Sequence, residues 1–159
     1  MDHENLFLTR TTSALLRLEY GVALAVCVVL AALHWRDVSW PTFVVLFAVI
    51  DVVGYLPGRV LWATRGPDGV PKACYVLYNV AHSGVTSAVF AGLWCLLVGP
   101  KWALLALPIH LLGDRALFGS FLKPFGLAFE PTADPGYVAF RSSYARSDTG
   151  HPLHAASRA

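Results

Sequence analysis

The chain has 159 residues, of which 56% are hydrophobic and 14% are charged, and its mean hydropathy is +0.56. An average soluble domain carries about 25% charged residues. The composition therefore excludes a disordered chain, and the long apolar blocks argue against an ordinary soluble domain. The net charge is only +2, and no basic stripe is interleaved with aromatic residues, so no nucleic-acid partner is expected.

Four segments are long and apolar enough to cross a bilayer, which takes about 20 residues of helix. The segments cover residues 13–33, 40–62, 73–98 and 101–122. They predict an all-α fold, an integral membrane four-helix bundle, with its transmembrane domain over residues 13–123. Residues 1–12 and 124–159 are expected to be tails. Pro108 lies inside the fourth segment and predicts a kink there.

The distribution of basic residues predicts the orientation of the bundle. Ten of the twelve Lys and Arg lie on the tails, the middle loop and the adjoining ends of the segments, whereas Arg36 and Lys101 lie on the other side. The positive-inside rule then places both termini in the cytoplasm and the chain in the cell membrane. Trp35, Trp40, Trp94 and Trp102 are expected at the outer interface.

The C-terminal tail differs in character from the apolar segments. Tyr137, Phe140 and Tyr144 recur at spacings of three and four, which predicts a short amphipathic helix on the membrane surface or at the mouth of the bundle. Residues 147–159 are predicted to be disordered, with His151 and His154 as solvated side chains.

Five acidic or histidine residues interrupt the apolar segments, although each costs several kcal/mol in hydrocarbon. They are Glu19, Asp51, His82, His110 and Asp114. In the predicted orientation all five fall between the midplane and the inner interface. His110 and Asp114 are spaced i, i+4 and share a helix face. We therefore expect these side chains to point inward and converge, as in the metal sites of soluble helical bundles.

Further polar residues accompany the five. Tyr55 follows Asp51 at i+4, and Asn79, His82 and Ser83 are spaced i, i+3 and i+4, so we expect them to share one helix face. We expect Tyr55, Tyr78, Asn79 and Arg115 to line a substrate pocket. Plainer interpretations remain open: Glu19 pairs with Arg17 or Arg115, and Asn79 and Ser83 only join helices by hydrogen bonds.

Several short motifs occur together over residues 14–124. They are Leu16-Arg17-Leu18-Glu19, Asp51-x-x-Gly54-Tyr55, Tyr78-Asn79-x-x-His82, His110-x-x-Gly113-Asp114-Arg115 and Gly119-x-x-x-Lys123. Their order resembles a small family of bacterial four-span integral membrane proteins of unknown function. That family reads His-x-Gly-x-Asp-Arg, then Gly-Tyr-Gly-Leu-Lys, then Thr-His. Here the glycine comes one position later, and Phe129-Glu130-Pro131-Thr132 replaces Thr-His, so no role for that last histidine carries over.

The first functional hypothesis is a membrane-embedded enzyme with a metal centre. Asp51, His82, His110 and Asp114 would be its ligands, with Glu19 as a further ligand or general base. Imidazole and carboxylate ligands together suit Zn, Fe or Mn. The substrate would be lipophilic, such as a lipid, an isoprenoid or a polyketide, and would enter from the inner leaflet.

Two alternatives need no metal. In the first, Asp51 or Asp114 donates a proton and His82 or His110 relays it, giving a cyclase or isomerase. Phe47, Tyr55, Tyr78 and Phe118 would then stabilise cationic character in the substrate. In the second, the protein is a small proton-coupled carrier or a structural membrane subunit. Each of these hypotheses is compatible with a chain that forms a homo-oligomer.

Overall fold

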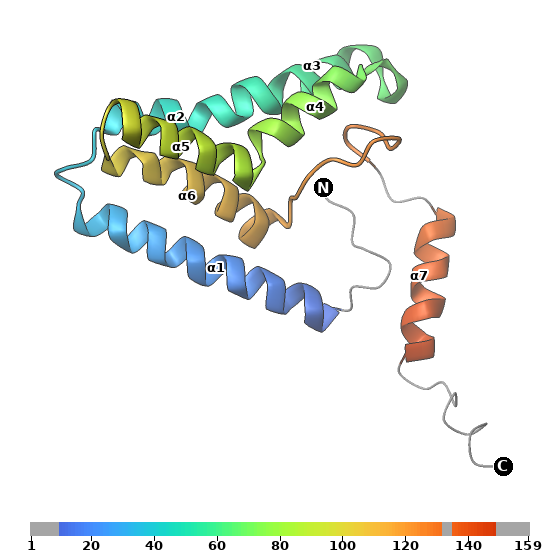
Figure 1. Cartoon of the computed structure of the whole chain (residues 1–159). Coiled ribbons are helices and arrows are strands. Elements are labelled where there is room, and N and C mark those ends of the chain that lie inside the picture. The colour runs from blue at the N-terminus through green and yellow to red at the C-terminus, as the bar shows by residue number, and fades with distance from the viewer. Residues whose placement is uncertain (1–9, 132–134, 149–159) are drawn as a thin grey trace.

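The computed structural model describes residues 10–131 and 135–148, and every regular element among them is helical (Figure 1). The α-helices are α1 (Arg10–Leu33), α2 (Trp40–Gly54), α3 (Leu56–Arg65), α4 (Lys72–Ala81), α5 (Gly84–Leu97), α6 (Ala106–Gly113) and α7 (Pro135–Asp148). Two short 3-10 helices, η1 (Pro67–Gly69) and η2 (Trp102–Leu105), and one π-helix, η3 (Asp114–Phe118), complete the set. The all-α prediction is confirmed. Residues 1–9 of the predicted N-terminal tail and 149–159 of the predicted disordered end, with His151 and His154, lie outside the described residues.

Two helices are long and apolar enough to cross a membrane. They are Thr11–Leu33, within α1, and Trp40–Arg65, formed by α2 and α3. α4 and α5 make a third if the bent pair is one span. The fourth segment, predicted as a single helix over residues 101–122, is instead η2, α6 and η3 in succession. Pro108 lies in the first turn of α6, where a missing N–H costs little, and the turn before it is 3-10.

The predicted third segment is not a single straight helix. α4 and α5 meet at an angle of 56°. His82 ends α4, and Ser83 caps α5 by accepting a hydrogen bond from the backbone N–H of Thr86 at 3.4 Å. Ser-Gly pairs such as Ser83-Gly84 commonly mark sharp kinks. The expectation that Asn79, His82 and Ser83 share one helix face is therefore wrong, because the helix axis changes direction between them.

The surface of the bundle is apolar, whereas its interior contains polar groups. Leu15, Leu18, Val22 and Val26 of α1 are each more than half exposed. The polar side chains buried among the described residues are His82, His110 and Lys123. A soluble protein rarely exposes so many large apolar side chains together, so the arrangement is consistent with a membrane protein.

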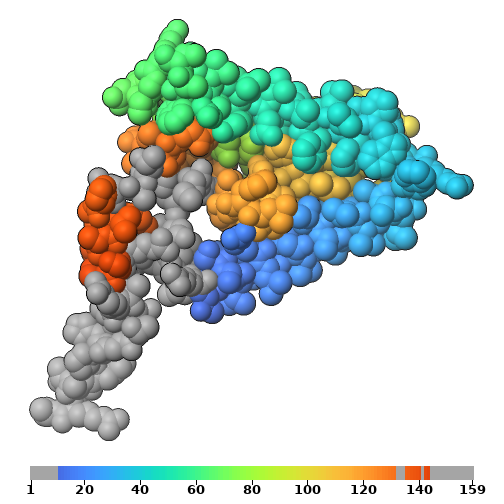
Figure 2. Space-filling model, turned by 180° about the vertical axis from the view of Figure 1, so that it is seen from behind, coloured from blue at the N-terminus to red at the C-terminus, as the bar shows by residue number. Residues whose placement is uncertain are grey.

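Two hydrophobic clusters position the polar interior. α6 lies between α1 and α2 (Figure 1), and the first cluster joins α2 to α6. It contains Leu46, Ile50, Ala106, Leu107 and Leu111. The second cluster joins α4 to the loop after η3, which lies against the α3–α4 end in Figure 2. It contains Cys74, Tyr75, Tyr78 and Phe129.

The C-terminal helix α7 contains the predicted aromatic residues Tyr137 and Phe140. Its presence as a helix agrees with the spacing of these aromatic residues. Its placement on a membrane surface stays a prediction, and the side chain of Tyr144 lies outside the part of the chain that the structure describes.

Candidate metal centre

Four of the five predicted ionisable residues come together between the two hydrophobic clusters. Asp51 comes from α2, His82 from the end of α4, His110 from α6 and Asp114 from the start of η3. We call these four residues the His/Asp cluster. Three changes of helix geometry, at His82, Tyr55 and Asp114, lie in or beside it. The irregular backbone therefore coincides with the polar site.

One oxygen of each carboxylate faces one nitrogen of each imidazole. His82 Nε2 lies 3.4 Å from Asp51 Oδ1 and 3.5 Å from Asp114 Oδ2. His110 Nε2 lies 3.6 Å and 3.5 Å from the same two oxygens. These distances are long for hydrogen bonds. Two ligand atoms that share a metal at about 2.0–2.2 Å lie about 3–3.6 Å apart, which matches all four distances.

A hydrogen bond sets the orientation of the His82 ring. His82 Nδ1 lies 3.0 Å from the carbonyl oxygen of Tyr78, and a carbonyl can only accept. Nδ1 therefore carries a proton, and in the neutral ring Nε2 presents its lone pair to the carboxylates. The ring also stacks on Tyr78, with centroids 3.9 Å apart. Metal-binding histidines are usually held in this way, with the second ring nitrogen donating to a carbonyl or carboxylate.

His110 is the least satisfied buried group in the His/Asp cluster. Its side chain is 3% exposed, and neither ring nitrogen has a hydrogen-bond partner among the described residues. A buried polar group without a partner costs about 1–3 kcal/mol. The Phe47 ring packs against the imidazole at 4.6 Å and helps to hold it in place, while Nε2 meets the two carboxylate oxygens only at 3.5–3.6 Å.

The donor set fits a divalent metal. Ligand atoms of Asp51, His82 and His110 lie within 4.8 Å of one another, close enough to hold an ion. Asp114 adds a second carboxylate beside both imidazoles. With both imidazoles neutral, as metal ligation requires, the two carboxylates would leave two negative charges, which a divalent cation would neutralise in a region where unpaired charge is costly.

A cavity of about 350 Å³ adjoins the His/Asp cluster. Its lining residues are Asp51, Tyr55, Tyr78, His82, Asp114, Phe118, Ser120, Lys123 and Glu130. Tyr55 and Tyr78 were predicted in a pocket, and Phe118 was among the aromatic candidates. The side chain of Asp51 is 52% exposed, so the His/Asp cluster is most accessible from the side on which this carboxylate lies.

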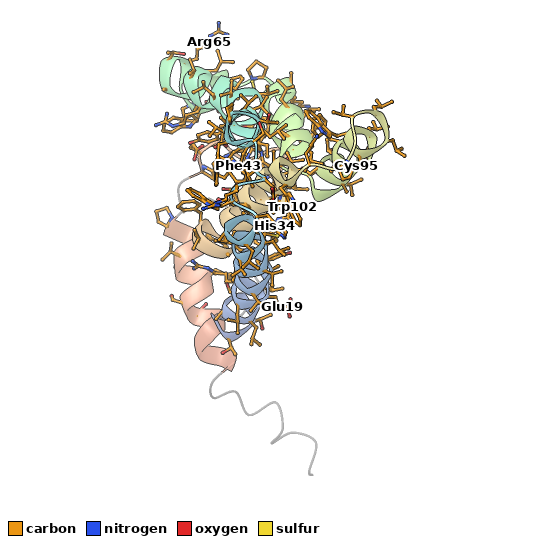
Figure 3. All side chains as sticks on the ribbon, turned by 90° about the vertical axis from the view of Figure 1, so that its left-hand side faces the viewer. Glu19, His34, Phe43, Arg65, Cys95 and Trp102 are labelled. Carbon is orange, nitrogen blue, oxygen red and sulfur yellow. The ribbon has the colours of Figure 1, made fainter. Side chains whose placement is uncertain are left out.

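The structure does not bring Glu19 to the His/Asp cluster. Its side chain is exposed on α1, on the opposite side of the molecule from Arg65 in Figure 3. α1 instead uses Arg17, which donates to the carbonyl oxygens of Ala116 and Leu117 at 2.8 and 2.6 Å. Depth along a helix was predictable, but a residue two positions from Arg17 faces another direction.

Two predicted pocket residues hold the backbone instead of lining the cavity. Arg115 Nη2 lies 3.5 Å from the carbonyl oxygen of His82, at the break after α4. Asn79 accepts from the backbone N–H of Lys123 at 2.7 Å and donates to its carbonyl oxygen at 2.9 Å. Both side chains therefore position residues that do border the cavity.

Sequence reasoning missed three cavity residues, Ser120, Lys123 and Glu130. Gly119 ends η3 with a φ of 66°, and the chain then returns to α4, where Asn79 binds it. The Gly119-x-x-x-Lys123 motif was a signal for Lys123. Glu130 stands in the segment that replaces the expected Thr-His, and its only signal was that departure.

Comparison with known proteins returns no match to any family model, curated protein or solved structure. The resemblance to the bacterial four-span family stays a prediction carried by the motifs. The fold and site together define an all-helical protein with two or three apolar helices that could cross a membrane and an internal His/Asp cluster. Its function has to be inferred from that geometry.

Proposed function

We propose that this chain is a membrane-embedded, metal-dependent enzyme that acts on a lipophilic substrate. The observation that supports this most strongly is the convergence of two imidazole nitrogens and two carboxylate oxygens at 3.4–3.6 Å. The ring of His82 is oriented by Tyr78, and buried His110 has no hydrogen-bond partner in the described chain. Metal ligands commonly have both features. In an interface that only packs helices together, an unpaired buried imidazole would reduce stability with no compensating gain.

The proposed membrane arrangement has four spans with both termini in the cytoplasm. In favour of a fourth crossing, η2, α6 and η3 follow one another without a non-helical residue between them. A π-helix inside such a segment is often found at functional sites. The His/Asp cluster and Lys123 would then lie in the cytoplasmic half of the cell membrane, within reach of lipid from the inner leaflet.

The proposed metal is Zn, Fe or Mn, held by Asp51, His82, His110 and Asp114. When bound, it would act as a Lewis acid on an oxygen of the substrate. The chain's own groups would orient the substrate and move protons. Asp51 borders the cavity and is half exposed, so it is the most accessible of the proposed ligands to a molecule there. The aromatic walls would hold the apolar part of a lipid, isoprenoid or polyketide.

The second candidate is a metal-free acid–base cyclase or isomerase. The aromatic lining from Tyr55, Tyr78 and Phe118 favours it, because ring faces stabilise cationic intermediates. Each imidazole also lies beside two carboxylates, as a proton relay requires. The two candidates differ in whether the His/Asp cluster binds a metal.

Metal analysis of the full chain, purified in detergent after growth in medium with Zn, Fe and Mn, tests the proposal. We expect about one divalent metal per chain, retained through gel filtration. After chelation, Co²⁺ should restore the stoichiometry and show visible absorption bands typical of nitrogen and oxygen ligands. A folded protein that takes up neither the native metals nor Co²⁺ would refute metal dependence and leave the acid–base candidate.

A further inference from the structure

The far end of the cavity contains a buried ammonium group. Lys123 is 6% exposed, and its Nζ donates to the carbonyl oxygen of Phe129 and to Glu130 Oε1, the latter at 3.3 Å. The rings of Phe129 and Tyr78 lie 4.2 and 4.9 Å from the Nζ atom. These contacts hold the group in one position at the cavity wall.

An ammonium group has three N–H donors. Within the described residues, hydrogen bonds to Phe129 and Glu130 account for two of them. Lys123 also lines the cavity, so one donor is left for an acceptor atom from a molecule in that space. A fixed, buried donor of this kind gives specificity because it is costly to leave without a partner.

The charge balance indicates which acceptor fits. Glu130 already offsets the positive charge of Lys123, and a divalent metal would offset Asp51 and Asp114. An anionic ligand would either displace Glu130 or bring an unbalanced negative charge into a region of low dielectric constant. An uncharged oxygen, such as the carbonyl of an ester or ketone, accepts the hydrogen bond and leaves the balance unchanged.

One ring connects the two ends of the cavity. Tyr78 stacks on His82 with centroids 3.9 Å apart, and the same ring lies 4.9 Å from Lys123 Nζ. Both ends therefore border the same aromatic wall, together with Tyr55 and Phe118. A flat or extended group lying along this wall would meet the His/Asp cluster and Lys123 together.

We infer that Lys123 binds the carbonyl oxygen of an uncharged lipophilic ester or ketone, and that Glu130 excludes anionic analogues. This inference rests on the proposed function for the reaction at the His/Asp cluster and adds the class of substrate. Lys123 is here a binding residue, distinct from the metal ligands.

The test uses two lipid probes of equal chain length, methyl palmitate and palmitate, each with a carbon-13 carbonyl. The full chain in nanodiscs is titrated above the pH range in which the acid ionises, and binding is followed by the NMR shift of the labelled carbon. The wild-type protein should bind the ester saturably and the anion more weakly. In Lys123→Met, ester binding should weaken by about tenfold or more, because a hydrogen bond to a charged donor is lost. Lys72→Met, which removes an exposed lysine of α4, should bind like the wild type.

A second variant separates binding from a purely structural role of Lys123. Glu130→Gln keeps an acceptor for Lys123 but removes its negative charge, so the preference should reverse and palmitate should bind better than the ester. Wild-type preference for palmitate, or ester binding that is unchanged in Lys123→Met, would refute the inference. If Lys123→Met does not fold, an unchanged preference in Glu130→Gln would refute it.

A third variant distinguishes this inference from the proposed metal site. His110→Ala removes a proposed ligand and leaves the contacts of Lys123 intact. Ester binding that persists in this variant supports the Lys123 site whatever the metal analysis shows. Loss of ester binding here, with wild-type binding in Lys123→Met, would assign the carbonyl to the His/Asp cluster and overturn the role of Lys123.

Discussion

The two polar ends of the cavity differ in how completely the chain satisfies them. At the His/Asp cluster, buried His110 has no hydrogen-bond partner among the described residues. At the other end, Asn79 pairs with both backbone groups of Lys123, and Phe129 and Glu130 receive its ammonium group. The cluster therefore leaves a buried ring with unused nitrogens, whereas the contacts of Lys123 also hold the loop after η3 in place and leave one N–H donor over. Substitutions at the cluster should therefore change metal binding, and substitutions around Lys123 should change stability.

The largest effect is expected from His110→Ala. Loss of one ligand should reduce metal affinity by more than about a hundredfold, so that the metal content falls from about one per chain to nearly zero. Metal analysis by mass spectrometry measures this content, and thermal unfolding checks that the fold persists. His34→Ala is the matched control, because His34 stacks on Trp102 away from the cluster. Wild-type metal content in His110→Ala would remove His110 from the ligand set.

Gly54→Ala should weaken the metal site without removing a ligand. A Cβ at Gly54 would lie 2.7 Å from Ala81 Cβ and 3.2 Å from His82 Nδ1, so the His82 ring would have to move. A change in the residues that orient a metal ligand typically reduces metal affinity by about 10–100-fold. Competition with a chelator measures the change. Gly92→Ala, whose Cβ would meet no atom within 4 Å, should leave the affinity unchanged.

Asn79→Ala should act on stability. It removes two hydrogen bonds to the backbone of Lys123 and should lower the free energy of unfolding by about 1–3 kcal/mol. Denaturant titration in detergent measures this loss, and metal affinity should stay at the wild-type value. Tyr75→Phe removes only the bond to the carbonyl oxygen of Leu127 and should cost about half as much. A large drop in metal affinity in Asn79→Ala would show that the two ends are coupled.

Ser83→Ala should have the smallest effect. The Ser83 side chain caps α5 through a long bond of 3.4 Å to the Thr86 N–H. Loss of a cap typically costs about 0.5–2 kcal/mol, and this one should lie at the lower limit. Thermal unfolding should show a small decrease, with wild-type metal content. A loss of metal comparable to that in Gly54→Ala would mean that the cap determines the position of His82.

Much of the His/Asp cluster was predictable from helical spacing and from the energetic cost of ionisable groups in hydrocarbon. His110 and Asp114 are one helical turn apart, and their side chains face each other at 3.5 Å in the structure. The cost of an ionisable group in hydrocarbon predicts that Asp51 and His82 also turn inward. The same argument failed for Glu19, because depth along α1 does not determine which side of the helix faces the bundle.

Lys123 and Glu130 show the opposite case. Their ion pair spans seven positions of an irregular loop, and no periodicity predicts how such a loop folds back. The loop is positioned by Asn79 and by Phe129, whose ring packs so closely on Gly58 that any Cβ there would overlap it. These contacts join segments far apart in the chain.

The sequence by itself determined the helical class, the apolar exterior and the types of polar residue in the interior. These features follow from the apolar segments and the few ionisable residues within them. A charged side chain is costly in hydrocarbon whatever the tertiary arrangement, so its inward position can be predicted from the sequence. Only the tertiary structure decided that α4 and α5 bend at His82, that Glu19 lies outside the cluster, and that Lys123 lines the cavity. Each of those outcomes depends on how helices rotate and pack against one another, which is set by contacts between segments distant in the chain.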